Sequence, residues 1–182
     1  MVYLGVPERI NPKSVPHPFT RAGRPSEPVA VAPDPSLPAY AELAVTTNYT
    51  FLTGASHPEE MVEAAAALGH RAVAIADVNT LAGIVRAHVA AKDAGIPLAV
   101  GCRVRIQHGG VASDTDASAG MSDLLVYPTS RPGYARLCGL LTLGKRRAPK
   151  GECHLRLEDL RDHADAGWLG VLIPPGDLAD PG

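Results

Sequence analysis

Short apolar and β-branched runs alternate with helix-like segments along most of this chain. The runs lie at 41–47, 72–76, 97–106, 124–127 and 169–173. The helix-like segments extend from Ser56 to Gly69, from Asn79 or Thr80 to Gly95, from Ser130 to Gly144, and over 157–166. Alternation of this kind predicts mostly parallel strands with helices packed outside them. The predicted fold class is therefore α/β.

The helices carry sequence signals at their ends and along their faces. Ser56 and Glu59 match a capping box at the start of the first helix, and Gly69 supplies a left-handed residue at its end. Gly95 ends the second helix. Apolar spacing predicts these buried faces: Met61, Ala65 and Leu68 in the first helix; Leu81, Ile84, Val85 and His88 in the second; Tyr134, Leu137, Cys138 and Leu141 in the third.

Two stretches interrupt this pattern. Nine of the 17 prolines lie at or before Pro38, and proline both lacks a backbone donor and disfavours helix at the residue before it. Residues 1–38 are therefore predicted to form an extended, disordered tail, with a folded domain over 39–182. Residues 107–122 are rich in Gly, Ser, Asp and Ala, which predicts a flexible surface loop.

Length, charge and cysteine usage exclude several classes of protein. A complete eight-stranded β/α barrel takes about 250 residues, so 182 residues predict part of a barrel or a small open sheet. The formal net charge of −2 excludes a wholesale polybasic nucleic-acid binder. No apolar run approaches the roughly 20 residues that span a bilayer. Three widely spaced cysteines offer neither a disulfide framework nor a CxxC pair, which predicts the reducing cytoplasm.

Long ordered strings of residues resemble a known family. They are 40–60 (YAELAVTTNYTFLTGASHPEE) and 72–86 (AVAIADVNTLAGIVR), continued at 101–103 (GCR). Together they resemble the polymerase and histidinol phosphatase (PHP) domain that opens bacterial C-family DNA polymerases. A later run, 140–152 (LLTLGKRRAPKGE), resembles the error-prone, ImuC-type branch of DnaE polymerases. The resemblance implies a partial, distorted TIM-like β/α barrel of PHP type.

The resemblance also implies a metal site whose ligand positions have changed. The positions that correspond to family ligands hold Ala44, Thr46, Thr53, Asp77, Val78 and Arg103. In the family they form a His-x-His on the first strand, an aspartate before a turn glycine, an Asp-His pair and a glutamate. A catalytic zinc needs about three protein ligands, whereas this set offers one carboxylate and a guanidinium. We expect no bound metal and no catalytic residue here.

Two hypotheses describe the remaining charges at these positions. In one, Arg103 fills the space of the metal and pairs with Asp77 as a structural ion pair. In the other, Asp77 caps the following helix and Arg103 points to solvent.

A basic cluster lies further along the chain. Residues 131–161 hold eight positive and three negative side chains. Lys145, Arg146, Arg147 and Lys150 are candidates for contact with DNA phosphates, which bind cations without any reading of sequence. Because the run follows a predicted helix end, the alternative is a solvated group of cations that complements the helix dipole.

The leading functional hypothesis is the PHP-like N-terminal segment of an error-prone translesion DNA polymerase. In the complete family protein, magnesium ions act in a separate palm domain, so this chain alone is expected to be inactive and to need no cofactor. The expected partners are the remainder of the polymerase chain or other lesion-bypass proteins, with DNA contact and no membrane, in the cytoplasm. The alternatives are a free-standing metal-dependent PHP phosphoesterase and an interaction module of the lesion-bypass machinery.

Overall fold

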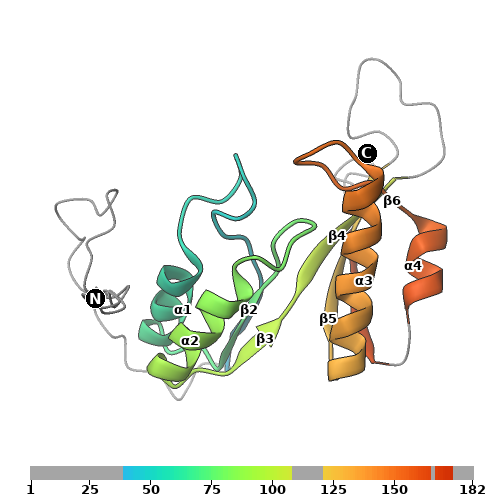
Figure 1. Ribbon diagram of the computed structural model, residues 1–182. Coiled ribbons are helices and arrows are strands. Elements are labelled where there is room, and N and C mark those ends of the chain that lie inside the picture. Colours follow the sequence, from blue (N-terminus) through green and yellow to red (C-terminus); the bar gives the residue numbers. More distant parts are fainter. Residues whose placement is uncertain (1–38, 108–120, 165–166, 174–182) are drawn as a thin grey trace, which may run out of the picture.

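The computed structural model describes residues 39–107, 121–164 and 167–173, drawn in colour in Figure 1. The predicted tail over 1–38 and the centre of the predicted loop lie outside these ranges, while Gln107 and Met121 belong to strands. The elements in the described ranges are β1 (Ala41–Val45), α1 (Pro58–Ala67), β2 (Ala72–Ile75), α2 (Ile84–Ala94), β3 (Leu98–Val100), β4 (Cys102–Gln107), β5 (Met121–Pro128), α3 (Arg131–Arg147), β6 (Leu155–Arg156), α4 (Leu157–His163) and β7 (Trp168–Ile173). The predicted α/β class is confirmed.

The first half of the domain is a parallel sheet in the order β1-β2-β3. Helices α1 and α2 lie side by side against it (Figure 1). Residues 73–75 of the central strand and Ala76 just beyond it are fully buried, as expected for a parallel strand covered on both faces. Val73 and Ile75 join Val62 of α1 and Ile84 of α2 in one apolar core.

The second half is a mixed sheet in the order β6-β4-β5-β7. Strands β4 and β5 pair in antiparallel orientation, and so do β5 and β7, whereas β4 and β6 are parallel. The expectation of mostly parallel strands therefore fails here, because a parallel pair needs a long crossover, usually helical, and residues 107–122 carry no helical pattern. Helix α3 covers this sheet with Leu137, Leu140 and Leu141.

Gly101 joins the two sheets. The predicted strand over 97–106 divides there, so that β3 pairs with β2 and β4 pairs with β5. The Gly101 N–H donates to the Ile75 carbonyl oxygen at 2.9 Å. A Cβ at this position would lie 2.7 Å from the Tyr127 ring, so the crossing requires a glycine.

Several predicted helix details are wrong. Helix α1 begins one residue later than the Ser56–Glu59 box predicts, because the His57 N–H donates to the Glu60 carboxylate at 2.9 Å. Leu68 is 55% exposed. In α2, which begins only at Ile84, the buried face consists of Ile84 and alanines, while Val85 and His88 are exposed. Small residues there allow α1 and α2 to approach closely.

Two of the three helices that were predicted to end at a glycine do end there. Gly69 and Gly95 adopt φ of 72° and 70°, which confirms the first two ends. Gly144 instead lies buried inside α3, where Leu155 and Cys153 occupy the space a side chain would need. Ser130 caps α3 by accepting a hydrogen bond from the Gly133 N–H at 3.1 Å. Within the described residues, no helix combines the length and apolarity needed to cross a membrane.

Candidate functional site

The Asp77 carboxylate lies directly beyond the C-terminal end of β2 and is 2% exposed. Its Oδ1 accepts hydrogen bonds from the Thr47 N–H and from the Thr50 hydroxyl, both at 2.7 Å. Its Oδ2 accepts a hydrogen bond from the Thr47 hydroxyl at 2.7 Å. Hydrogen bonds to an ionised acceptor are short and strong. Three protein donors therefore hold this buried carboxylate.

The two threonine hydroxyls are themselves held in place by the backbone. Thr47 Oγ1 accepts from the Tyr49 N–H at 3.2 Å, and Thr50 Oγ1 accepts from the Val78 N–H at 3.0 Å. Each hydroxyl thus accepts from the chain and donates to Asp77. The result is a closed network in which the loop after β1 wraps the acid after β2.

The loop over 47–54 adopts this shape because backbone N–H groups within it donate to backbone carbonyl oxygens of the same loop. Thr50 N–H donates to the Thr47 carbonyl at 2.9 Å, and Gly54 N–H donates to the Thr50 carbonyl at 3.0 Å. Thr47 and Thr50 were missing from the predicted site. A signal for them exists: carboxyl ends of neighbouring parallel strands meet at one sheet edge, and these hydroxyls follow one such strand while Asp77 follows the next.

The remaining positions that correspond to family ligands are spread around this network. Ala44 lies in β1, Thr46 and Val78 lie just beyond strands, and all three are half-buried, whereas Thr53 is exposed on the loop. Across the described ranges, no three His, Cys, Asp or Glu side chains gather closely enough to hold a metal ion.

The hypothesis that Arg103 pairs with Asp77 is wrong. The Arg103 N–H donates to the Asp77 carbonyl oxygen at 3.1 Å, but Nη1 of its side chain lies 3.8 Å from Oδ2 of Asp123. The threonines already occupy the Asp77 carboxylate. The capping alternative is also wrong, because α2 begins seven positions further on, at Ile84, and the Arg103 side chain is only 25% exposed.

The alternation of β4 explains where Arg103 lies. Cys102, Val104 and Ile106 face the core under α3, so Arg103 and Arg105 occupy the other face of the sheet. The antiparallel register places Asp123 opposite Arg105. Arg105 binds both oxygens of Asp123, through Nε at 2.9 Å and Nη2 at 3.1 Å.

Tyr127 of β5 lies near the same group of charges. Its hydroxyl donates to the Leu43 carbonyl oxygen of β1, so it links the two sheets. Burial raises the pKa of Tyr127 above its usual value, although the Arg103 charge acts in the opposite direction. The phenol therefore stays protonated and keeps its donor role at neutral pH.

The basic cluster lies at the end of α3. Lys145, Arg146 and Arg147 form the last helical turn, where the sequence predicted them to follow the helix. Arg147 binds both oxygens of Asp159 on α4, at 2.6 and 2.9 Å, and is therefore part of a structural ion pair. Lys145, Arg146 and Lys150 are exposed.

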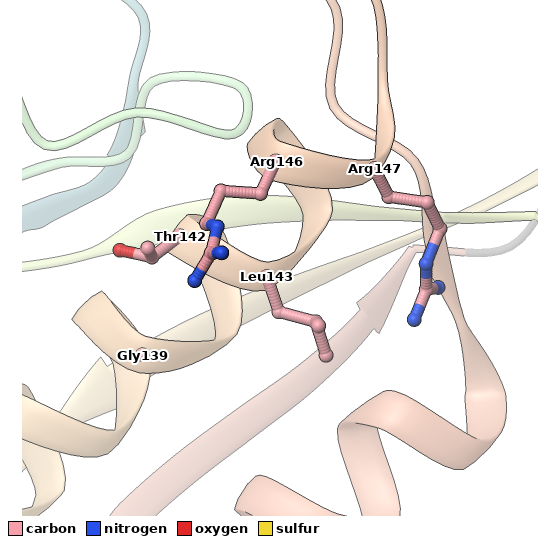
Figure 2. Close-up of a pocket in the computed structure, with 5 residues that line it drawn as sticks. All are labelled: Gly139, Thr142, Leu143, Arg146 and Arg147. Atoms are coloured by element: carbon pink, nitrogen blue, oxygen red, sulfur yellow. The ribbon is translucent and has the colours of Figure 1, made fainter.

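A hollow of about 580 Å³ runs along one face of α3 (Figure 2). It is lined by Gly139, Thr142, Leu143, Arg146 and Arg147. Arg146 extends back along the helix toward Thr142, while Arg147 reaches toward α4.

We expect the Arg147–Asp159 pair to give the fold an acid-sensitive component. The Arg147 guanidinium holds the pKa of Asp159 below its usual value. A lowered folded-state pKa means that this stabilisation is complete above about pH 4, the unfolded value. It is lost as the pH falls through the folded-state value. Urea midpoints measured from pH 7 to pH 2 should show less decline for Asp159→Asn than for the exposed control Glu158→Gln, and equal declines would contradict this assignment.

The sequence matches a known domain family and known polymerases. The PHP domain family model matches residues 42–179. An error-prone DNA polymerase of Caulobacter vibrioides is 48% identical over 143 residues, which cover 79% of this chain and 12% of that protein. An error-prone DNA polymerase of Allorhizobium ampelinum is 46% identical over 141 residues, 78% of this chain and 12% of that protein.

Among solved structures, an amidohydrolase of Chromobacterium violaceum is similar with a TM-score of 0.47 and 22% identity, over 59% of this chain and 34% of that one. This chain spans about an eighth of the length of the polymerases that it matches. The match to the family model covers most of the α/β domain and includes both sheets. This chain belongs to the PHP domain family.

Proposed function

We propose that this chain is a PHP domain without hydrolytic activity that serves as the N-terminal scaffold of an error-prone, ImuC-type DNA polymerase. It would act in the cytoplasm, during translesion synthesis. The similarity to error-prone polymerases supports the assignment to that machinery. One observation supports the absence of hydrolytic activity: both oxygens of the Asp77 carboxylate already accept hydrogen bonds from Thr47 and Thr50.

The residues present do not fit a catalytic metal. Ala44 and Val78 have no donor atom in their side chains, and an alcohol such as Thr46 or Thr53 is a poor ligand for the metals that imidazole and carboxylate bind. Asp77 directs its oxygens to threonine donors at 2.7 Å. A guanidinium at the Arg103 position would repel a divalent cation. The residues that the structure describes therefore offer no ligand set for a metal-dependent step.

The scaffold role is tested by assembly in trans. The test uses the Caulobacter vibrioides error-prone polymerase from which the 143 matching residues have been removed. The full 182-residue chain should form a one-to-one complex with this shortened protein in size-exclusion chromatography. The intact polymerase is the control and should not bind, because its own segment fills the position. Binding to neither protein, or to both equally, would contradict the proposal.

We propose in addition that Lys145, Arg146 and Lys150 contact the phosphates of single-stranded DNA. These side chains are exposed and gather at the end of one helix, whereas Arg147 is held by Asp159. Phosphate contacts of this kind position a nucleic acid without reading its sequence.

The combined variant Lys145→Ala, Arg146→Ala and Lys150→Ala is expected to weaken binding of a single-stranded oligonucleotide. Loss of three phosphate contacts should reduce the slope of log K against log salt by about 2. Fluorescence anisotropy between 50 and 200 mM salt, about the range in which such contacts are resolved, measures this slope. A control with Arg71→Ala and Lys92→Ala, in the half of the domain formed by α1 and α2, should keep the slope, and an unchanged slope in the triple variant would count against the contact.

A further inference from the structure

The Arg103 side chain, on the face of the second sheet that points away from α3, lacks a hydrogen-bond partner for one of its buried donors among the described residues. Its Nε is buried and has no hydrogen-bond partner among the described residues. Its Nη1 lies 3.8 Å from Asp123, beyond the usual hydrogen-bond distance of about 3.2 Å. Buried donors in folded proteins are almost always paired, so an unpaired one calls for an explanation such as a bound ion.

The carboxylates of Asp123, Glu42 and Asp77 are each bound by donors other than the Arg103 side chain. Asp123 accepts two hydrogen bonds from Arg105. Glu42, which acts electrostatically on Tyr127, accepts from the Tyr40 hydroxyl at 2.6 Å and from the Ala44 N–H at 2.9 Å. Asp77 is held by the two threonines. The acid that the Arg103 side chain approaches, Asp123, is therefore already engaged by Arg105.

The charges on this face do not balance within the strand pair. Arg103 and Arg105 share the face with one carboxylate, Asp123, and Arg105 takes both of its oxygens. One guanidinium fork is left over. A quarter of the Arg103 side chain is exposed, which leaves solvent-side access to it.

We propose that Arg103 is the centre of an oxyanion site that binds a phosphoryl group. A guanidinium presents parallel N–H donors that match two oxygens of a phosphate, and a phosphate has further oxygens that can face Arg105. Such a ligand would supply acceptors to Nε and Nη together. In this chain the position that corresponds to a family metal ligand would thus bind an anion in place of a cation. The site stands on Arg103 and its neighbours, independently of any assembly with a polymerase.

The test measures binding of inorganic phosphate to the full chain by isothermal titration calorimetry, with acetate at equal ionic strength as a planar comparison. Arg103→Gln should weaken phosphate binding about tenfold or more, as expected for charge-assisted hydrogen bonds. Asp123→Asn should strengthen it, because the competing carboxylate is gone. Lys92→Gln, an equal change of charge on α2, should leave it unchanged.

Three results would overturn the site: no phosphate binding to the parent chain, equal binding by Arg103→Gln, or acetate binding as tight as phosphate. The tighter phosphate binding expected of Asp123→Asn keeps the test informative even if Arg103→Gln folds poorly.

A second experiment titrates the chain with an oligonucleotide that either carries or lacks a 5′-phosphate. If the oligonucleotide competes with inorganic phosphate, and Arg103→Gln abolishes this competition, the bound phosphoryl group belongs to a nucleic acid. If the two do not compete, the site binds a small phosphate. The triple variant at the end of α3 should keep its phosphate affinity, which separates this site from the proposed DNA contact.

Discussion

Replacing Asp77 with alanine is expected to destabilise the domain by at least about 3 kcal/mol. The substitution leaves the Thr47 N–H and the hydroxyls of Thr47 and Thr50 without their acceptor in a site where Asp77 is 2% exposed. Each buried donor that loses its partner costs about 1–3 kcal/mol. Because single domains have a free energy of unfolding of about 5–15 kcal/mol, this loss is a large fraction of the total.

Urea unfolding of the full chain measures the effect. Glu63→Ala, an exposed acid on α1, is the matched control and should change the free energy of unfolding by less than about 0.5 kcal/mol. A double-mutant cycle with Thr50→Val should show that this second change costs much less once Asp77 is absent. An unchanged or raised stability in Asp77→Ala would show that the acid is held for another purpose and would contradict the structural role.

Gly54→Ala is expected to have an effect of similar size. A Cβ at Gly54 would overlap the carbonyl oxygen of Thr47 and lie 3.1 Å from the Asn48 nitrogen. Both obstacles are backbone atoms that cannot rotate away, so the loop around Asp77 would have to move. Overpacking typically costs about 1–3 kcal/mol and more where backbone must shift, and here the hydrogen bonds to Asp77 would weaken as well.

Gly139→Ala provides the control for this second substitution. Its Cβ would meet nothing closer than 3.6 Å, at the His163 ring, and alanine favours a helix over glycine by about 1 kcal/mol. Thermal or urea unfolding should therefore show loss of stability for Gly54→Ala and none for Gly139→Ala. Equal stability of the two variants would mean that the loop over 47–54 is not closed around Asp77.

The parts of the fold that could be predicted were those with local causes. Short apolar or β-branched runs marked β1 and β2, and glycines marked the ends of α1 and α2, where the structure gives them positive φ. The antiparallel β5, the two-residue β6 and the burial of Gly144 depend on contacts between distant segments, which periodicity does not report.

The candidate site divides in the same way. The sequence predicts that Asp77 and Arg103 carry the remaining charges at the family ligand positions, and the structure places them on adjacent segments. Their partners could not be predicted, because the choice between Arg103, Thr47 and Thr50 depends on loop geometry. Complementary charge favoured an ion pair, but three donors at 2.7 Å already occupy the carboxylate.

Metal content is the most direct test of a PHP domain without its hydrolytic centre. The full chain is incubated with zinc or manganese, dialysed, and analysed by mass spectrometry alongside a phosphoesterase assay. We expect retained metal far below one ion per chain and no phosphoesterase activity sensitive to a chelator. One tightly held ion per chain, together with phosphoesterase activity that a chelator abolishes, would contradict the account.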